Sequence, residues 1–183
     1  GYATAFTVIN NREVELAQRI AAQTPGDLNR IFFTTGGSTA VDSALRLCQL
    51  ASNIKGQPQR KHILTREKAY HGSTYLSASV TGKERDKTAM DIMRDGIHFL
   101  SAPCQFYHPQ FETESAFCDF LVDEMEQKIL ALGADNIMCF IAEPILASGG
   151  VIVPPADYNF RIWQMIKRYG ITYIADEVVT AFG

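Results

Sequence analysis

The sequence has 183 residues, 46% of them hydrophobic and 20% charged, so it is long and apolar enough to bury a core as one globular domain. Seventeen basic and twenty acidic residues give a formal net charge of −3, and without any Lys/Arg run nucleic acid is not an expected partner. No apolar run approaches the roughly 20 residues of a transmembrane helix, so we expect no membrane contact and a cytoplasmic location.

The first third of the chain has the pattern of two helices separated by a strand and a turn. An amphipathic helix is predicted over residues 11–22 and ends at a turn rich in Pro and Gly. Residues 31–34 form a short apolar, aromatic run that is typical of a buried strand. Gly36 and Gly37 then allow a tight turn, and an apolar repeat with helical spacing predicts a helix that ends before Gly56.

The start of this second helix carries polar residues that suit two roles. Thr39 and Asp42 resemble a capping box in which Asp replaces the usual Glu or Gln. The free N–H groups and the positive dipole end of a helix that begins here form a seat for a phosphate or another anion. Two glycines before a helix fit a plain structural turn equally well, and N-capping alone explains one hydroxyl of the pair Ser38 and Thr39.

Strands and helices alternate along the rest of the chain. Residues 81–96 are charged and poorly periodic, so we expect a surface connection with one helical turn. Nearly all-apolar strands that alternate with helices predict an α/β fold of three layers, in which helices cover both faces of a mostly parallel sheet. The predicted strands are residues 62–65, 96–100, 137–142 and 171–175, and the predicted helices follow residue 74 and cover 115–132 and 162–169.

The cysteines lie far apart in the sequence, without a C-x-x-C pair or a histidine at metal-ligand spacing. We therefore expect buried, reduced thiols and no metal site. These residues are Cys48, Cys104, Cys118 and Cys139.

Distinctive polar residues follow four of the predicted strands. In chain order they are Gly36–Thr39, Tyr70–Gly72, Glu143 and Asp176. Because ligands of an open parallel sheet bind beyond the carboxyl ends of its strands, we expect these segments to converge on one rim. Their convergence is more informative than any one motif.

Each of these residues also has an ordinary structural explanation. Tyr70 fits a core aromatic with a hydrogen-bonded hydroxyl as well as a ring that stacks on a ligand. His71 fits a loop histidine whose ring is satisfied by backbone groups. Glu143, held extended by the following proline, fits a carboxylate that accepts loop N–H groups. Asp176 follows an apolar strand, where a carboxylate needs a cationic partner, and a protonated ring nitrogen of a ligand is such a partner.

A phosphate seat, a stacking aromatic ring and a buried carboxylate together describe a pyridoxal phosphate (PLP) pocket. The chain resembles, in order and spacing, motifs of the class III (omega) aminotransferases at Phe32–Asp42, Tyr70–Gly72, Ala142–Pro144, Gly149–Pro155 and Ala175–Val178. This resemblance covers nearly the whole chain and implies the central part of the large, cofactor-binding domain of fold type I.

This resemblance implies which residues contact the cofactor phosphate and the faces of its ring. Gly37 and Ser38, with Thr39 beside them, would bind the phosphate. Tyr70 would stack on the pyridine ring, and Val178 would pack on the opposite face.

It also implies which residues surround the ring nitrogen. Asp176 would pair with that nitrogen and keep it protonated, so that the ring accepts electrons from the substrate. His71 belongs to the same cofactor-binding set, and Glu143 would line the floor of the pocket. The chain departs from the family at Thr39, where members often have Glu, and at Leu146, where they often have Gln.

One requirement of the family has no counterpart in the chain. The Schiff-base lysine is expected on a further strand and loop beyond Asp176. The sequence starts at Gly1 without Met and stops at Gly183, so we expect residues 1–183 to be a partial large domain, inactive alone, that lacks the small domain and the lysine region. The lysines that match no family position are Lys55, Lys61, Lys68, Lys83, Lys87 and Lys128, and Lys167 falls on the polar side of a predicted helix.

The expected parent protein is therefore an enzyme that moves an amino group from an amine or amino acid to a 2-oxo acid, as a homodimer. Two alternatives stay open. The family also includes a decarboxylase, racemases and aminomutases, which share the fold and the cofactor. A non-catalytic PLP-binding protein that truly lacks the lysine is the other alternative.

Overall fold

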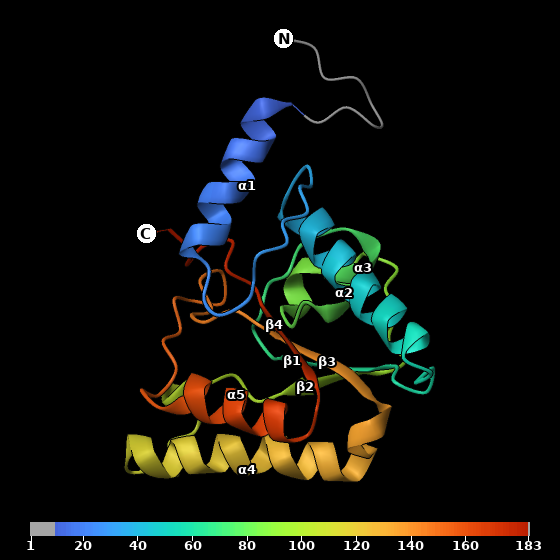
Figure 1. The fold of residues 1–183 in the computed structure, drawn as a ribbon. Helices are drawn as coiled ribbons and strands as arrows, with labels where there is room; N and C mark the ends of the chain where they lie inside the picture. The colour runs from blue at the N-terminus through green and yellow to red at the C-terminus, as the bar shows by residue number, and fades with distance from the viewer. Residues whose placement is uncertain (1–9, 183) are drawn as a thin grey trace. The chain divides into compact units, whose positions relative to one another are not determined.

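The computed structural model describes residues 10–182 and divides the chain into two compact units, residues 1–34 and residues 35–183 (Figure 1). Within the described residues, no helix is both long and apolar enough to cross a membrane.

The described residues of the first unit, 10–34, contain one helix, α1 (Asn11–Gln23), close to its predicted bounds. Asn10 caps it, since its side chain accepts the N–H groups of Arg12 at 2.7 Å and Glu13 at 3.2 Å. The Glu13 carboxylate in turn accepts the N–H of Asn10 at 3.2 Å, which completes a capping box.

The strand predicted at residues 31–34 is wrong. These residues form no strand, and the side chains of Phe32 and Phe33 are exposed. An apolar run becomes a strand only where a neighbouring strand pairs with its backbone N–H and C=O groups. The sheet of the described residues consists of four other strands, so this segment has the composition of a strand without its pairing.

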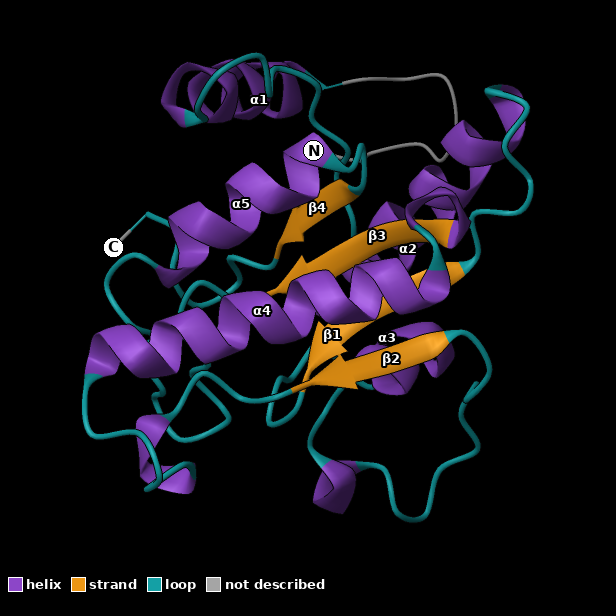
Figure 2. Cartoon of the chain, turned by 90° about the horizontal axis from the view of Figure 1, so that it is seen from below, coloured by secondary structure: helices purple, strands orange, loops and turns teal. Residues whose placement is uncertain are grey.

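The second unit is built on a four-stranded sheet whose order is β2-β1-β3-β4 (Figure 2). Every neighbouring pair is parallel, with Ile63 opposite Ile97 and Phe140 opposite Tyr173. The all-apolar β3 is buried along its whole length, as expected of a central parallel strand. The strands are β1 (His62–Arg66), β2 (Ile97–Leu100), β3 (Ile137–Ala142) and β4 (Thr172–Ala175), within two residues of each predicted strand.

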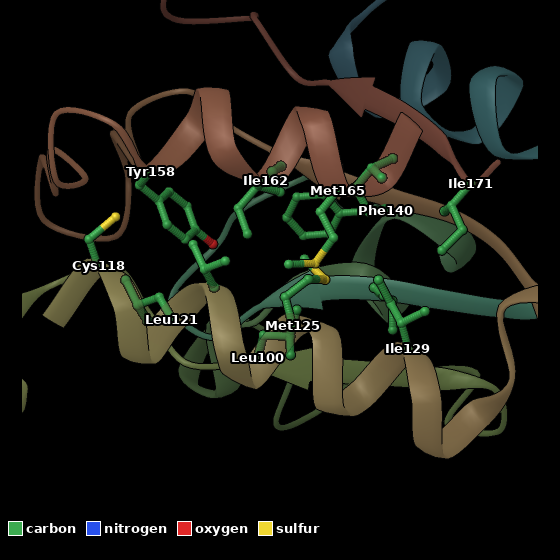
Figure 3. Packing of buried hydrophobic residues seen from close by; sticks show 14 of the residues in the cluster. Leu100, Cys118, Leu121, Met125, Ile129, Phe140, Tyr158, Ile162, Met165 and Ile171 are labelled. Atoms are coloured by element: carbon green, nitrogen blue, oxygen red, sulfur yellow. The ribbon is translucent and has the colours of Figure 1, made fainter. Parts of the chain in front are cut away.

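Helices cover both faces of this sheet, which confirms the predicted three-layer α/β fold (Figures 1 and 2). Helices α4 (Glu114–Leu132) and α5 (Tyr158–Arg168) pack on one face, and α2 (Gly37–Ile54) and α3 (Tyr75–Val80) cover the other. The larger hydrophobic cluster lies between the sheet and α4 and α5, where Met125, Phe140 and Ile162 are almost completely buried (Figure 3).

Short 3₁₀ helices occupy three of the connections. The charged segment 81–96 contains one such turn, as predicted. All four cysteines carry free thiols, and Cys118 and Cys139 are buried whereas Cys48 and Cys104 are partly exposed. The 3₁₀ helices are Glu84–Asp86, Gln105–Tyr107 and Ala134–Asn136.

Helix α4 begins at a side-chain cap that gives a first prediction. The hydroxyl oxygen of Thr113 accepts the N–H of Ala116 at 3.2 Å. Thr113→Ala leaves this N–H without its acceptor, so we expect it to lower the free energy of unfolding in urea by about 1 kcal/mol. Thr113→Ser keeps the acceptor and serves as the control. An equal loss in the serine variant would mean that the methyl group of Thr113, not its cap, carries the effect.

Candidate functional site

A cavity of about 360 Å³ lies at the carboxyl ends of the strands in the second unit. This volume is within the usual range of small-molecule pockets. Residues from the start of α2 and from the loops after β1, β3 and β4 line it, so the predicted convergence of four segments is confirmed. Of the predicted site residues, Thr39 does not line the cavity, and those that do are Gly37, Ser38, Tyr70, His71, Glu143, Asp176 and Val178.

The N-terminus of α2 forms one wall of the cavity. The helix starts at Gly37, and its N-cap residue Gly36 has no side chain that could accept the first N–H groups. The N–H groups of the first turn of a helix have no acceptors inside the helix, and they stand at the positive end of its dipole. This end of α2 therefore attracts an anion that enters the cavity.

The capping box predicted at Thr39 and Asp42 is wrong. A capping box needs its first residue at the helix boundary, but α2 begins two residues before Thr39. The Thr39 hydroxyl donates to the carbonyl oxygen of Gly36 at 2.8 Å, and the Asp42 carboxylate accepts the N–H of Ser77 at 2.9 Å. Asp42 thus joins α2 to the first turn of α3.

The loop that follows Tyr70 and His71 packs closely on the start of α2. The Ser38 hydroxyl oxygen accepts the N–H of Ser73 at 3.1 Å, which leaves the hydroxyl hydrogen available to a ligand. Gly72 has a φ of +126°, and a Cβ at this position would lie 2.4 Å from the Ser38 hydroxyl oxygen. Only glycine fits here, although the sequence analysis gave Gly72 no role of its own.

Glu143 connects two of the loops around the cavity. Its two carboxylate oxygens accept the N–H of Tyr70 at 2.9 Å and the N–H of Ala147 at 3.1 Å. Its carbonyl oxygen accepts a hydrogen bond from the guanidinium of Arg66, a side chain that is completely buried. The structural explanation of Glu143, a carboxylate that accepts loop N–H groups, is therefore confirmed. Tyr70 is 38% exposed and lines the cavity, so it is not a core aromatic.

His71 and Asp176 form a buried pair. Their Nδ1 and Oδ2 atoms are 2.7 Å apart, and the expectation that backbone groups satisfy the His71 ring is wrong. The other oxygen of Asp176 accepts the N–H of Val178 at 3.3 Å. Because an ionised carboxylate only accepts hydrogen bonds, the proton of the pair lies on Nδ1 of His71. The Nε2 atom of His71 is buried without a partner among the described residues.

Four lining residues were missed by the sequence analysis. Ile145 and Ser148 lie on the same loop as Glu143, and Val179 and Thr180 lie on the loop of Asp176. Their proximity in sequence to a predicted site residue was the only available signal. Leu146, where family members often have Gln, is buried in a small hydrophobic cluster with Ala69 and does not line the cavity. In the described part of the chain, no group of three or more His, Cys, Asp or Glu side chains gathers in a way that would hold a metal ion.

Comparisons with known proteins agree with this architecture. The model of the family described as Aminotransferase class-III matches residues 2–183. The putrescine–pyruvate aminotransferase of Pseudomonas aeruginosa is 37% identical over 182 residues, which are 100% of this chain and 40% of that protein. Gamma-aminobutyrate transaminase 1 of Oryza sativa, named mitochondrial, is 37% identical over 172 residues, 93% of this chain and 33% of that protein.

A solved structure with a similar fold is the PMP-bound form of an aminotransferase from Vibrio fluvialis. It superposes with a TM-score of 0.93 at 36% identity and covers 100% of this chain and 40% of that one. The chain thus spans between a third and two fifths of the length of these relatives.

Proposed function

Because the chain belongs to the class III aminotransferases, we propose that residues 1–183 form part of the large, PLP-binding domain of an enzyme that moves an amino group from an amine or amino acid to a 2-oxo acid. The observation that carries the proposal is the cavity itself. An uncapped helix N-terminus, an exposed aromatic ring and a buried carboxylate with its histidine line one space of about 360 Å³.

The residues fit the chemical groups of PLP. The N–H groups at the start of α2 and the Ser38 hydroxyl suit a phosphate. The side chains of Tyr70 and Val178 supply surfaces for a planar ring. Asp176 keeps free lone pairs after accepting from His71 and Val178, so it can accept one more N–H.

When bound, PLP supplies an electron-withdrawing ring that stabilises the negative charge developing on the substrate carbon. The protein residues prepare the site for this. Asp176 would hold the proton on the ring nitrogen, and His71 orients Asp176 through Nδ1. Glu143 fixes the Tyr70 backbone, which sets where the aromatic ring stands.

The proposal also requires a Schiff-base lysine, and no lysine lines the cavity in the described part of the chain. Reading the gene past Gly183 tests this requirement. A downstream lysine in a strand-end loop supports the aminotransferase, whereas a stop codon directly after Gly183 leaves only non-catalytic PLP binding. Assays of the protein from the complete reading frame for keto product, racemisation and decarboxylation then separate the reactions that share this fold.

The proposed phosphate contact predicts the effect of Ser38→Ala. Removing the hydroxyl deletes one donor to the phosphate, so we expect the dissociation constant of PLP to rise about ten- to a hundredfold, as for a hydrogen bond to a charged group. The Ser73 N–H also loses its acceptor, which should lower the free energy of unfolding by a smaller amount, about 1 kcal/mol. Equilibrium dialysis of the protein from the complete reading frame measures the affinity.

Thr39→Ala is the matched control, because the Thr39 hydroxyl is on the next residue but donates to Gly36 and does not line the cavity. Equal retention of PLP by the Ser38 variant, the Thr39 variant and the wild type would refute the phosphate assignment of Ser38. The homodimer and the cytoplasmic location stay predictions, which sedimentation and cell fractionation would test.

A further inference from the structure

Lys83 stands behind the wall of the proposed cofactor cavity. It follows α3, and its side chain is only 15% exposed. A second cavity, of about 590 Å³, is lined by Lys83 on one side, and Ser148 lines both this cavity and the cofactor cavity. Tyr70 lines the cofactor cavity but not the second cavity. The ammonium group of Lys83 therefore contacts Tyr70 and Ser148, although Lys83 does not itself line the cofactor cavity.

Three contacts hold this ammonium group. It donates to the Ser148 hydroxyl oxygen at 2.9 Å and forms an ion pair with Asp86 at 2.7 Å. It also lies 5.5 Å from the centroid of the Tyr70 ring, within the range of a cation–π interaction. Among the described residues, no other cation lies over that ring.

We propose that Lys83 is a positioning residue that fixes the Tyr70 ring and the Ser148 loop in the orientation that receives the cofactor. This inference rests on the proposed function. Glu143 already fixes the backbone of Tyr70, but this bond does not restrict the side-chain torsions of a residue that is 38% exposed. Lys83 supplies that contact, and through Ser148 it ties the loop after β1 to the loop after β3.

The anchor of Lys83 persists at neutral pH. Hydrogen bonds from Lys83 and then Arg85 lower the pKa of the Asp86 carboxyl, which stays ionised. Arg85 binds the other oxygen of Asp86 at 3.1 Å but makes no contact with Tyr70 or Ser148. Arg85 is therefore a cation that shares the partner Asp86 with Lys83 but does not hold the Tyr70 ring or the Ser148 loop.

The test uses PLP and the protein from the complete reading frame. Lys83→Met should raise the dissociation constant of PLP about three- to tenfold and weaken the induced circular dichroism of the bound cofactor, because a cation–π contact and a hydrogen bond to a charged group are both lost. Lys83→Arg, which keeps a cation, should recover most of the signal. Arg85→Met, the matched control, should bind PLP as the wild type does.

A double-mutant cycle with Tyr70→Leu distinguishes positioning from general stability. In the leucine background Lys83→Met should have a much smaller effect on PLP affinity. Wild-type affinity in the single Lys83→Met variant, or an undiminished loss in the leucine background, overturns the role of Lys83 and leaves the proposed function intact. Wild-type protein that binds no PLP overturns the proposed function, and the role of Lys83 with it.

Discussion

Gly72→Ala is expected to lower the free energy of unfolding by about 2–6 kcal/mol, the sum of a strained backbone and an overpacked contact. The φ of +126° at Gly72 is a conformation that L side chains rarely adopt. A Cβ there would also lie 2.6 Å from the Ser77 hydroxyl oxygen and 2.8 Å from the Cα of Ser38. A hydroxyl can rotate away, but the Cα belongs to the backbone of α2, so α2 or the loop must move.

Gly36→Ala is the matched control for this prediction. A Cβ at Gly36 would meet no atom within 4 Å, and the backbone there is extended, with a φ of 174°. We expect its free energy of unfolding to stay within about 0.5 kcal/mol of the wild type. Urea denaturation measures both variants. Similar stability of the two would show that the loop at Gly72 shifts away from α2 at little cost.

Asp176→Asn is expected to reduce amino-group transfer by the protein from the complete reading frame by about 10²-fold or more, and Asp176→Ala should abolish it. Asparagine keeps the size of the side chain but not its charge, so the proton on the ring nitrogen loses its counter-ion and Nδ1 of His71 loses its carboxylate partner. Removing one partner of a buried ion pair typically costs about 3–5 kcal/mol, which corresponds to factors of this size.

Glu177→Gln provides the control, since it makes the same chemical change one residue later on an exposed side chain that does not line the cavity. Its turnover should match the wild type. The absorption spectrum of the bound cofactor should change in the Asp176 variants and not in the Glu177 variant. Near-normal turnover with Asn at position 176 would refute the assignment of Asp176 to the ring nitrogen.

The local sequence pattern was enough to predict elements that nearby residues stabilise and elements that are buried along their whole length. The strand β3 matches its predicted bounds because six apolar residues stand between Gly133 and the Glu143–Pro144 corner. Residues 31–34 have an equally apolar pattern and form no strand, because pairing depends on a neighbour that no local pattern reveals. The proposed cap at Thr39 failed for a similar reason, since Gly37 and Ser38 were already helical.

The sequence predicted that the site residues meet at one edge of the sheet, but not which of them form hydrogen bonds with one another. Parallel strands bring their carboxyl ends to one edge, so Tyr70, Glu143 and Asp176 were expected to meet. That His71 pairs with Asp176 depends on the strand order β1-β3-β4, which places the loops after β1 and β4 around the same cavity. Sequence order alone does not specify strand order. The contact of Lys83 with the Tyr70 ring was missed because the pattern of residues 81–96 indicates only a charged connection.

The contacts that close the cavity join residues far apart in the chain. The bond from Tyr70 to Glu143 spans 73 residues, and the His71–Asp176 pair spans 105. During synthesis on the ribosome, α2 and β1 are translated long before β4. The growing chain therefore cannot close the cavity until residue 176 has left the ribosome.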